Sequence, residues 1–185
     1  DHAAAVPYIY YDNPRQAAAL LAHELAGNPT REMCVIGVTG TNGKTSTVFL
    51  TQHILKHAGR SCAKFGTLGY DLGDTFVEAP HTTPFGEDLA VLFQQAKQAS
   101  IDHTVMEVSS HALAQERVAG ISFNVAAFTN LTRDHLDYHE TMEAYLQAKL
   151  KLFERVRETH EQQESNWPCF TVVNFEDLNA ARFME

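Results

Sequence analysis

The sequence predicts an α/β protein with a largely parallel β-sheet flanked by helices. Short apolar runs rich in β-branched residues alternate along the chain with amphipathic segments of helical periodicity. Because parallel strands need long crossovers, which are usually helices, this alternation favours a parallel sheet covered on both faces. The length of 185 residues suits one domain, and a composition that is 44% hydrophobic and 20% charged can bury a core.

The first element expected is a helix near the amino terminus. Residues 1–15 are expected to be irregular, because Pro7 and Pro14 bracket a short aromatic run. Pro14 suits the first turn of a helix, residues 15–26 are rich in Ala and Leu, and Gly27 is a helix-ending residue. We therefore expect a helix over residues 15–26.

Two strands and a helix are expected next. Residues 33–38 form an apolar, β-branched run typical of a buried strand. Residues 47–57 have apolar side chains at helical spacing, and Gly59 is placed to end that helix. A second strand is expected over residues 61–65, followed by a segment, 66–73, that turns back on itself.

The rest of the chain alternates in the same way. The expected elements are a helix over residues 86–99, a buried strand over 103–108, a further strand over 124–130, a long helix over 141–164 and a last strand over 169–173. The charged end of the long helix, residues 154–164, is expected to be solvated rather than to form a binding tail.

The segment between the first strand and the second helix has the composition of a phosphate-binding loop. Gly40 and Gly43 let backbone N–H groups approach phosphate oxygens at the amino end of a helix, where the helix dipole favours anions. Lys44 can reach the terminal phosphates of a nucleotide, and the Thr45 hydroxyl can bind Mg²⁺. Val38 stands where the common pattern has its first glycine, so the loop is a variant. A glycine turn with an exposed lysine is the alternative interpretation.

Polar residues also follow the later strands of the predicted sheet. Ligands of such sheets bind outside the carboxyl ends of the strands, so residues that follow different strands should share one crevice. Glu107 ends an otherwise apolar strand and can hold Mg²⁺, directly or through water, or take part in a surface ion pair. Ser109 and Ser110 can cap the next helix, hydrogen-bond a substrate, or do both.

A dense group of titratable residues follows the strand at 124–130. Its members, Asp134, His135, Asp137 and His139, are potential metal ligands or proton carriers. The sequence has neither a close cysteine pair nor a His-Glu-x-x-His motif, so Mg²⁺ is favoured over zinc beside a phosphate loop. On the long helix that follows, Lys149 is expected from its residue type alone to be an exposed, snorkelling side chain.

Charge, cysteine content and hydropathy exclude several classes of protein. A net charge of -9 argues against a general binder of nucleic acid or anionic membranes. Cys34, Cys62 and Cys169 are odd in number and far apart, which favours free thiols in a reducing compartment. No stretch approaches the roughly 18 apolar residues of a membrane span, and no secretory signal is visible. We therefore expect a cytoplasmic protein without membrane insertion.

Taken together, these motifs resemble those of the ATP-dependent Mur ligases of peptidoglycan synthesis, and within that family the members that add the third amino acid. The resemblance rests on Gly-Val-Thr-Gly-Thr-Asn-Gly-Lys-Thr-Ser at 37–46, His-Thr-Thr-Pro at 81–84, Glu-Val-Ser-Ser-His-Ala-Leu at 107–113, Gln115 with Arg117, Thr-Asn-Leu-Thr-Arg-Asp-His-Leu-Asp-Tyr-His at 129–139 and Ala-Lys at 148–149. The motifs occur in the order found in the family, and the variant phosphate loop is the family's own form.

The resemblance implies a central ATP-binding domain of the P-loop type and a two-step ligation. ATP phosphorylates the terminal carboxylate of UDP-N-acetylmuramoyl-L-alanyl-D-glutamate, and the amine of meso-diaminopimelate or L-lysine then attacks the acyl phosphate. The expected partners are therefore the UDP-muramoyl dipeptide and a diamino acid, with no nucleic acid. The protein is expected to be a monomer.

The resemblance also implies roles for individual residues. It assigns the binding of ATP to Gly40, Thr41, Asn42, Gly43, Lys44, Thr45, Ser46 and Asn130. It assigns contacts with the muramoyl substrate to His81, Thr82, Thr83, Ser109, Gln115 and Arg117, and some members have asparagine in place of His81. The implied Mg²⁺ partners are Thr45, Glu107, His135 and Lys149, the last as a carbamate. The implied catalytic residues are Lys44, His135 and Lys149.

Family members are much longer than this chain. Residues 1–30 are expected to be the linker and helix that end an N-terminal domain, and residues 31–185 an incomplete central domain. The C-terminal ligase domain is expected to be absent, so the isolated chain should ligate negligibly. Folylpolyglutamate synthase and the cyanophycin-type synthetases share the loop and the lysine and are alternatives. A non-catalytic nucleotide-binding fragment and a phosphoryl-transfer kinase are alternatives of other classes.

Overall fold

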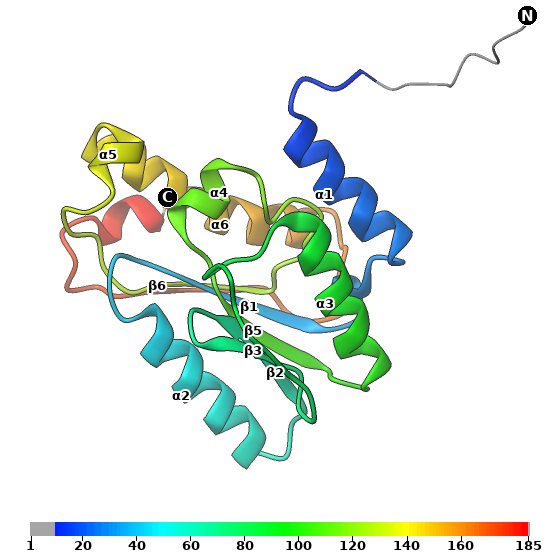
Figure 1. Ribbon diagram of the computed structural model, residues 1–185. Helices are drawn as coiled ribbons and strands as arrows, with labels where there is room; N and C mark the ends of the chain where they lie inside the picture. Colours follow the sequence, from blue (N-terminus) through cyan, green and yellow to red (C-terminus); the bar gives the residue numbers. More distant parts are fainter. Residues whose placement is uncertain (1–9, 185) are drawn as a thin grey trace, which may run out of the picture.

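The computed structural model describes residues 10–184, and these residues form a seven-stranded sheet with the order β4-β3-β2-β5-β1-β6-β7 (Figure 1). Five neighbouring strands are parallel, namely β2 (Cys62–Gly66), β5 (His103–Glu107), β1 (Cys34–Thr39), β6 (Val125–Phe128) and β7 (Phe170–Val173). The short strands β3 (Gly69–Asp71) and β4 (Phe76–Val77) extend one edge in antiparallel fashion. The predicted class, an α/β protein with a largely parallel sheet, is confirmed.

Helices cover both faces of this sheet (Figure 1). The helix α2 (Lys44–His57) packs on one face against β1, β2 and β5. The opposite face carries α6 (Met142–Glu161) and α3 (Gly86–Gln98), and α1 (Pro14–Leu25) packs on α3. The shorter helices are α4 (Ser110–Ala114), α5 (Leu136–His139) and the 3-10 turns η1 (Pro29–Arg31) and η2 (Ala180–Phe183).

The core lies in two layers because successive strand residues point to opposite faces. On β1, Val35 joins the larger cluster on the α3 and α6 face, whereas Val38 joins the smaller cluster under α2. Gly37 lies between them, and a Cβ there would lie 2.9 Å from Leu152 Cδ1. The missing side chain therefore lets α6 approach the middle of the sheet closely.

The predicted elements are confirmed, with their ends shifted by a few residues. The helix expected over residues 47–57 begins three residues earlier, at Lys44, because the phosphate loop passes directly into it through a left-handed Gly43. The segment expected to turn back at 66–73 does so and forms strand β3, whereas the edge strand β4 and the helix α5 were not expected. Residues 1–9 of the segment expected to be irregular lie outside the described residues.

The prediction of a solvated end for the long helix is wrong on one side of that helix. Val156 and Thr159 are buried there. Arg155 forms a 2.7 Å ion pair with Glu116, which ties the helix to the segment after α4. The helix itself ends at Glu161 rather than at residue 164.

The cysteines are free thiols, as the sequence predicts. Burial raises the pKa of Cys34 to about 11 and that of Cys62 to about 12, so both are protonated near neutral pH. Within residues 10–184, no helix has the length and apolar character that crossing a membrane requires.

His23 is a buried polar side chain between α1 and the rest of the domain. Its ring is fully buried beside Gly120 and 6.1 Å from the ring of Phe93. Neither ring nitrogen has a hydrogen-bond partner among the residues that the structure describes. Burial lowers the pKa of His23 to about 4, because a charged imidazolium would be desolvated without compensation.

We expect His23 to make the fold sensitive to acid. The ordinary pKa of 6.5 lies above the folded value of about 4. As the pH falls, His23 is therefore protonated in the unfolded chain before it is protonated in the folded protein. The stability that depends on neutral His23 is fully present above about pH 6.5 and is lost as the pH falls toward 4. Between pH 7 and 4.5, urea denaturation should show that the wild type loses about 2 kcal/mol more stability than His23→Leu. His57→Leu, at an exposed position, should behave like the wild type, and equal losses in all three proteins would contradict this assignment.

Candidate functional site

The phosphate loop connects β1 to α2 at the carboxyl end of the sheet. Gly40 and Gly43 have φ angles of 146° and 85°, which favour glycine. Lys44 folds back over the loop, and its Nζ donates to the carbonyls of Gly40 and Thr41, each at 2.9 Å. Burial lowers the pKa of Lys44, although the charge of Glu107 opposes that shift. The first N–H groups of α2 have no acceptor within the helix, so the loop and helix together form a cradle for an anion.

A second loop, residues 129–132, braces the phosphate loop. Asn130 uses both ends of its amide: Oδ1 accepts from the N–H of Asn42 at 3.0 Å, and Nδ2 donates to the Asn42 carbonyl at 3.1 Å. The Thr129 hydroxyl donates to the same carbonyl at 2.6 Å, and the N–H of Thr41 donates to the Asn130 carbonyl at 2.8 Å. The 129–132 loop therefore fixes the backbone around which a phosphate would bind.

Glu107 is a buried carboxylate at the end of β5, only 2% exposed. Its Oε2 accepts from the Thr45 hydroxyl at 2.9 Å, and its Oε1 accepts from the N–H of Thr67 at 2.9 Å. A Cβ at Gly66 would clash with this carboxylate. The alternative of a surface ion pair is wrong, because Glu107 is buried and these partners, a hydroxyl and a backbone N–H, are uncharged.

Thr67 is a site residue that the sequence did not reveal. Besides its N–H, its hydroxyl oxygen lies 3.3 Å from Glu107 Oε2 and 3.1 Å from Thr82 Oγ1, so it can donate to the carboxylate and accept from the Thr82 hydroxyl. Thr67 directly follows the second predicted strand, and residues at the carboxyl ends of parallel strands are expected to share one crevice. Its position was therefore the one feature of the sequence that could have indicated it. An isolated threonine has no further chemical pattern by which to identify it.

The residues expected to contact a substrate line the neighbouring wall. Thr83 is buried, its hydroxyl donates to the Glu107 carbonyl at 2.9 Å, and it accepts from the N–H of Ser109 at 3.0 Å. Ser109 caps α4 by accepting from the N–H of Ala112 at 3.2 Å, as predicted. Ser110 is within α4, and its hydroxyl lies 2.9 Å from His139 Nε2 instead.

Arg117 completes this wall. Its Nε and Nη2 donate to Gln115 Oε1 at 2.9 and 2.6 Å, and its Nη1 donates to the Thr83 carbonyl at 3.1 Å. The guanidinium lies 4.2 Å from the centre of the Phe85 ring, and the ring of His81 packs against the same phenyl at 5.1 Å. The structure thus brings together residues that are more than thirty positions apart in sequence.

Lys149 is buried, at 1% exposed, so the expectation of a surface lysine is wrong. It lies on the inward face of α6, with Nζ 4.3 Å from the centre of the Tyr145 ring. Burial and the nearby charge of Lys44 lower the pKa of Lys149 to about 7. The hydroxyl oxygen of Tyr145 lies 3.2 Å from Thr41 Oγ1, and this hydrogen bond links α6 to the phosphate loop.

The titratable residues at 134–139 do not converge on one point. His135 is exposed, has a left-handed φ of 52° and lies 3.5 Å from Asp134 through Nε2 and Oδ2. His139 is buried against Ser110, and burial together with neighbouring positive groups lowers its pKa to about 4. Between residues 10 and 184, no three His, Cys, Asp or Glu side chains form a group that could hold a metal ion.

His111, which the sequence did not single out, lies between these histidines. Its ring is 4.8 Å from that of His135 and 5.4 Å from that of His139. His135 also faces the Tyr145 ring at 6.0 Å, so His135 and Lys149 share a tyrosine although the structure gives no direct bond between them.

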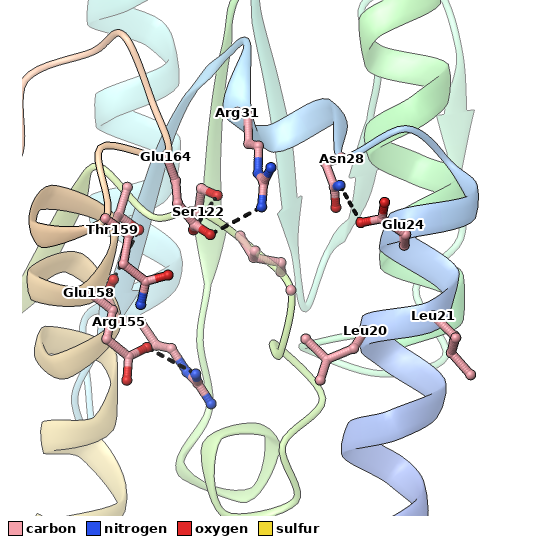
Figure 2. Close-up of a pocket in the computed structure, with 13 residues that line it drawn as sticks. Leu20, Leu21, Glu24, Asn28, Arg31, Ser122, Arg155, Glu158, Thr159 and Glu164 are labelled. Atoms are coloured by element: carbon pink, nitrogen blue, oxygen red, sulfur yellow. Dashed lines mark hydrogen bonds and ion pairs between the residues drawn. The ribbon is translucent and has the colours of Figure 1, made fainter. Parts of the chain in front are cut away.

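A separate cavity of about 430 Å³ lies between α1, the segment before β6 and the end of α6 (Figure 2). Its charged side chains pair with one another: Arg31 with Glu164 at 3.1 Å, and Arg155 with Glu158 at 3.0 Å. Glu24 accepts from Asn28 at 2.6 Å. Because the cavity lies near the amino ends of β1 and β6, it does not belong to the site at the strands' carboxyl ends.

Known proteins resemble this chain in sequence and in fold. A family profile described as the Mur ligase middle domain matches residues 38–185, well over half of the chain. The chain belongs to the Mur ligase family. A UDP-N-acetylmuramoyl-L-alanyl-D-glutamate–2,6-diaminopimelate ligase of Bacillus licheniformis is 41% identical over 98% of this chain and 37% of that protein. The ligase of the same name from Solibacter usitatus is 44% identical over 96% of this chain and 35% of that protein.

Solved structures of Mur ligases and related enzymes have the same fold. A structure of a ligase with that same name superimposes with a TM-score of 0.78 at 29% identity, covering 95% of this chain and 34% of the other. A folylpolyglutamate synthase of Mycobacterium tuberculosis gives a TM-score of 0.67 at 18% identity, covering 92% and 43%. This last likeness concerns the fold alone. The chain spans roughly a third of the length of the Mur ligases that it matches.

We expect Gly40 to be irreplaceable because of both its backbone angle and its surroundings. A Cβ there would clash with Thr129 Oγ1, whereas a Cβ on Gly59, which also has a positive φ of 77°, meets nothing within 4 Å. Gly59→Ala should lower the free energy of unfolding by about 1 kcal/mol, the cost of the left-handed angle. Gly40→Ala should lower it by about 3 kcal/mol, since overpacking adds to that cost. Urea denaturation checks both values, and equal losses would show that the contact with Thr129 is unimportant.

Proposed function

We propose that this chain is the nucleotide-binding part of an ATP-dependent ligase that joins an amino acid to UDP-N-acetylmuramoyl-L-alanyl-D-glutamate. The observation that supports the proposal best is the pairing of buried Glu107 with the Thr45 hydroxyl at 2.9 Å, directly beside the loop of Lys44. A hydroxyl and a carboxylate at the end of a phosphate loop are the oxygen donors that Mg²⁺ and a nucleotide require.

In this proposal, the phosphate groups of ATP bind the loop from Gly40 to Ser46, and Asn130 keeps the loop in place. The hydrogen bonds of Lys44 to the carbonyls of Gly40 and Thr41 hold its ammonium group over the loop, where it would contact a terminal phosphate of the nucleotide. Thr45 and Glu107 would hold Mg²⁺, and His135 would contribute to a second ion. A bound Mg²⁺ supplies neutralisation of the phosphate charge during transfer.

We further propose that Lys149 is carbamylated. Carbamylation needs a neutral amine, and a pKa of about 7 makes a large fraction of Lys149 neutral at physiological pH. The amine nitrogen bonds to the carbon of CO₂ and releases one proton, which gives a carbamate anion. That anion would offset the positive charge of Lys44, which disfavours the protonated form of Lys149.

The substrate-side wall has the chemistry to hold the muramoyl peptide. The guanidinium of Arg117 bonds Gln115 and the Thr83 carbonyl through three of its N–H groups, and one N–H on each terminal nitrogen remains for a carboxylate or a phosphate. Gln115, Thr83 and Ser109 fix that wall to the end of β5, with Thr82 and His81 beside them. The terminal carboxylate of the peptide would attack the γ-phosphorus of ATP and expel ADP. The incoming amine would then attack the acyl carbon and release one proton to solvent, and phosphate would leave as the C–N bond of the amide forms.

The names of the relatives support diaminopimelate as the added amino acid. Both the Bacillus licheniformis and the Solibacter usitatus proteins are named as 2,6-diaminopimelate ligases. The expected boundary at residue 30, between the end of a preceding domain and the central domain, stays a prediction. The helix α1 within that segment packs on α3.

The ligase function can be tested with a chimera in which this chain replaces the matching third of the Bacillus licheniformis enzyme. We expect ADP release that requires both the UDP-muramoyl dipeptide and diaminopimelate. Glu107→Gln in the chimera should lower kcat by about a hundredfold or more, because a neutral amide replaces the anionic oxygen ligand of the metal site. Glu176→Gln, at an exposed position, is the matched control.

Three outcomes of the chimera assay would overturn the proposal. Release of ADP with tetrahydrofolate and glutamate would favour the folylpolyglutamate synthase alternative. A stable phosphorylated product formed without any amine would indicate a kinase. Nucleotide binding without turnover, under conditions in which the parent enzyme is active, would favour a non-catalytic fragment.

Carbamylation of Lys149 can be tested separately by ¹³C NMR of the chain in ¹³C-bicarbonate. A carbamate signal should be present in the wild type and absent from Lys149→Arg. It should rise as the pH increases through about 7, because the neutral amine is the reacting form and the pKa lies there. Lys97→Arg removes an exposed, ion-paired lysine and should retain the signal. A signal that persists in Lys149→Arg would contradict the assignment.

A further inference from the structure

The turn that follows β7 contacts the back of the 129–132 loop. Asn174 Nδ2 donates to the Thr129 carbonyl at 2.8 Å, and Asp177 Oδ2 accepts from the N–H of Leu131 at 2.8 Å. These two hydrogen bonds fix Thr129 and Leu131, the residues on either side of Asn130. The side-chain amide of Asn130 is in turn hydrogen-bonded to the backbone of Asn42 in the phosphate loop. The turn at 174–180 is therefore connected to Asn42 through a single intervening loop.

The turn is itself rigidly organised. Asp177 Oδ1 accepts from the N–H and the side-chain amide of Asn179, at 2.8 and 3.0 Å. Burial opposes ionisation of Asp177, but the hydrogen bonds from Leu131 and Asn179 outweigh it and lower the pKa of the carboxyl. The carboxylate is therefore charged near neutral pH and accepts strong hydrogen bonds.

Aromatic stacking anchors the far end of the turn. Phe183 stacks on Phe128, at the end of β6, with ring centres 3.9 Å apart and planes 18° apart. It also meets Phe153 of α6 at 5.0 Å. The turn thus has one fixed end on β7, another on the core, and two hydrogen bonds directed at the loop between them.

We propose that Asp177 and Asn174 are positioning residues for nucleotide binding, acting through the 129–132 loop. The inference rests on the proposed nucleotide function of the phosphate loop. Neither residue needs to touch the ligand. Without the Asp177 carboxylate, the N–H of Leu131 loses its acceptor, and Asn130 is no longer fixed against Asn42. The phosphate loop then has to be ordered by the nucleotide itself, which weakens binding.

The test measures the affinity of the chain for Mg²⁺-ADP by titration calorimetry. Asp177→Asn replaces one of the two acceptor oxygens by an NH₂ donor, so the bonds from Leu131 and from Asn179 cannot both be kept, and it should weaken binding about tenfold, the equivalent of one lost hydrogen bond. Asn174→Ala leaves Asp177 in place and should shift the affinity in the same direction by less. Glu176→Gln, between the two, should bind like the wild type. Wild-type affinity in Asp177→Asn would overturn the proposal.

Amide hydrogen exchange without nucleotide separates a positioning role from a general loss of stability. In Asp177→Asn, exchange should accelerate at Leu131 and Asn42, while the amides of β2 and β5 keep their protection. If the wild type does not bind Mg²⁺-ADP, the nucleotide function fails, and exchange still tests the connection. Unchanged exchange at Asn42 in Asp177→Asn would show that the turn does not brace the phosphate loop.

Discussion

The arrangement of the site depends on burying one carboxylate, that of Glu107, at the end of the central strand β5. A buried charge is costly unless it is hydrogen-bonded or paired. Here the partners come from two different connections, Thr45 at the start of α2 and Thr67 after β2. The same requirement explains Gly66, which leaves room for the carboxylate. One charge therefore fixes how the ends of β1, β2 and β5 meet.

The positive groups of the site follow from the same constraint. Lys149 is buried and Lys44 is half-buried, and burial lowers the pKa of both, while the charge of Lys44 lowers the pKa of Lys149 further. Glu107 and Asp134 act in the opposite direction. A chain with a net charge of -9 can still place a single cation, Lys44, at its phosphate loop, where it suits a phosphate group. The overall charge excludes a broad basic surface but says little about such a local site.

The sequence predicts the parts of the structure that repeat a local pattern. Apolar runs and helical spacing predict the strands and long helices, and the rule of strand ends predicts that Glu107 and the phosphate loop meet. Other features depend on tertiary contacts. The burial of Lys149 is decided by which face of α6 meets the phosphate loop, and Thr67 has no distinctive spacing. The left-handed His135 and the short α5 likewise lie in a segment without periodicity.

The proximity of the two walls of the site follows from their common attachment to β5. The Glu107 side chain faces Thr45, while its backbone carbonyl accepts from the Thr83 hydroxyl at 2.9 Å. Ser109, two residues later, bonds to the same Thr83. In the proposed function, a metal-bound phosphate and a substrate carboxylate would therefore be positioned by groups that are both hydrogen-bonded to Glu107, the last residue of β5. Transfer between two such groups gains most from fixed orientation, so a strand end shared by both walls is a suitable framework for it.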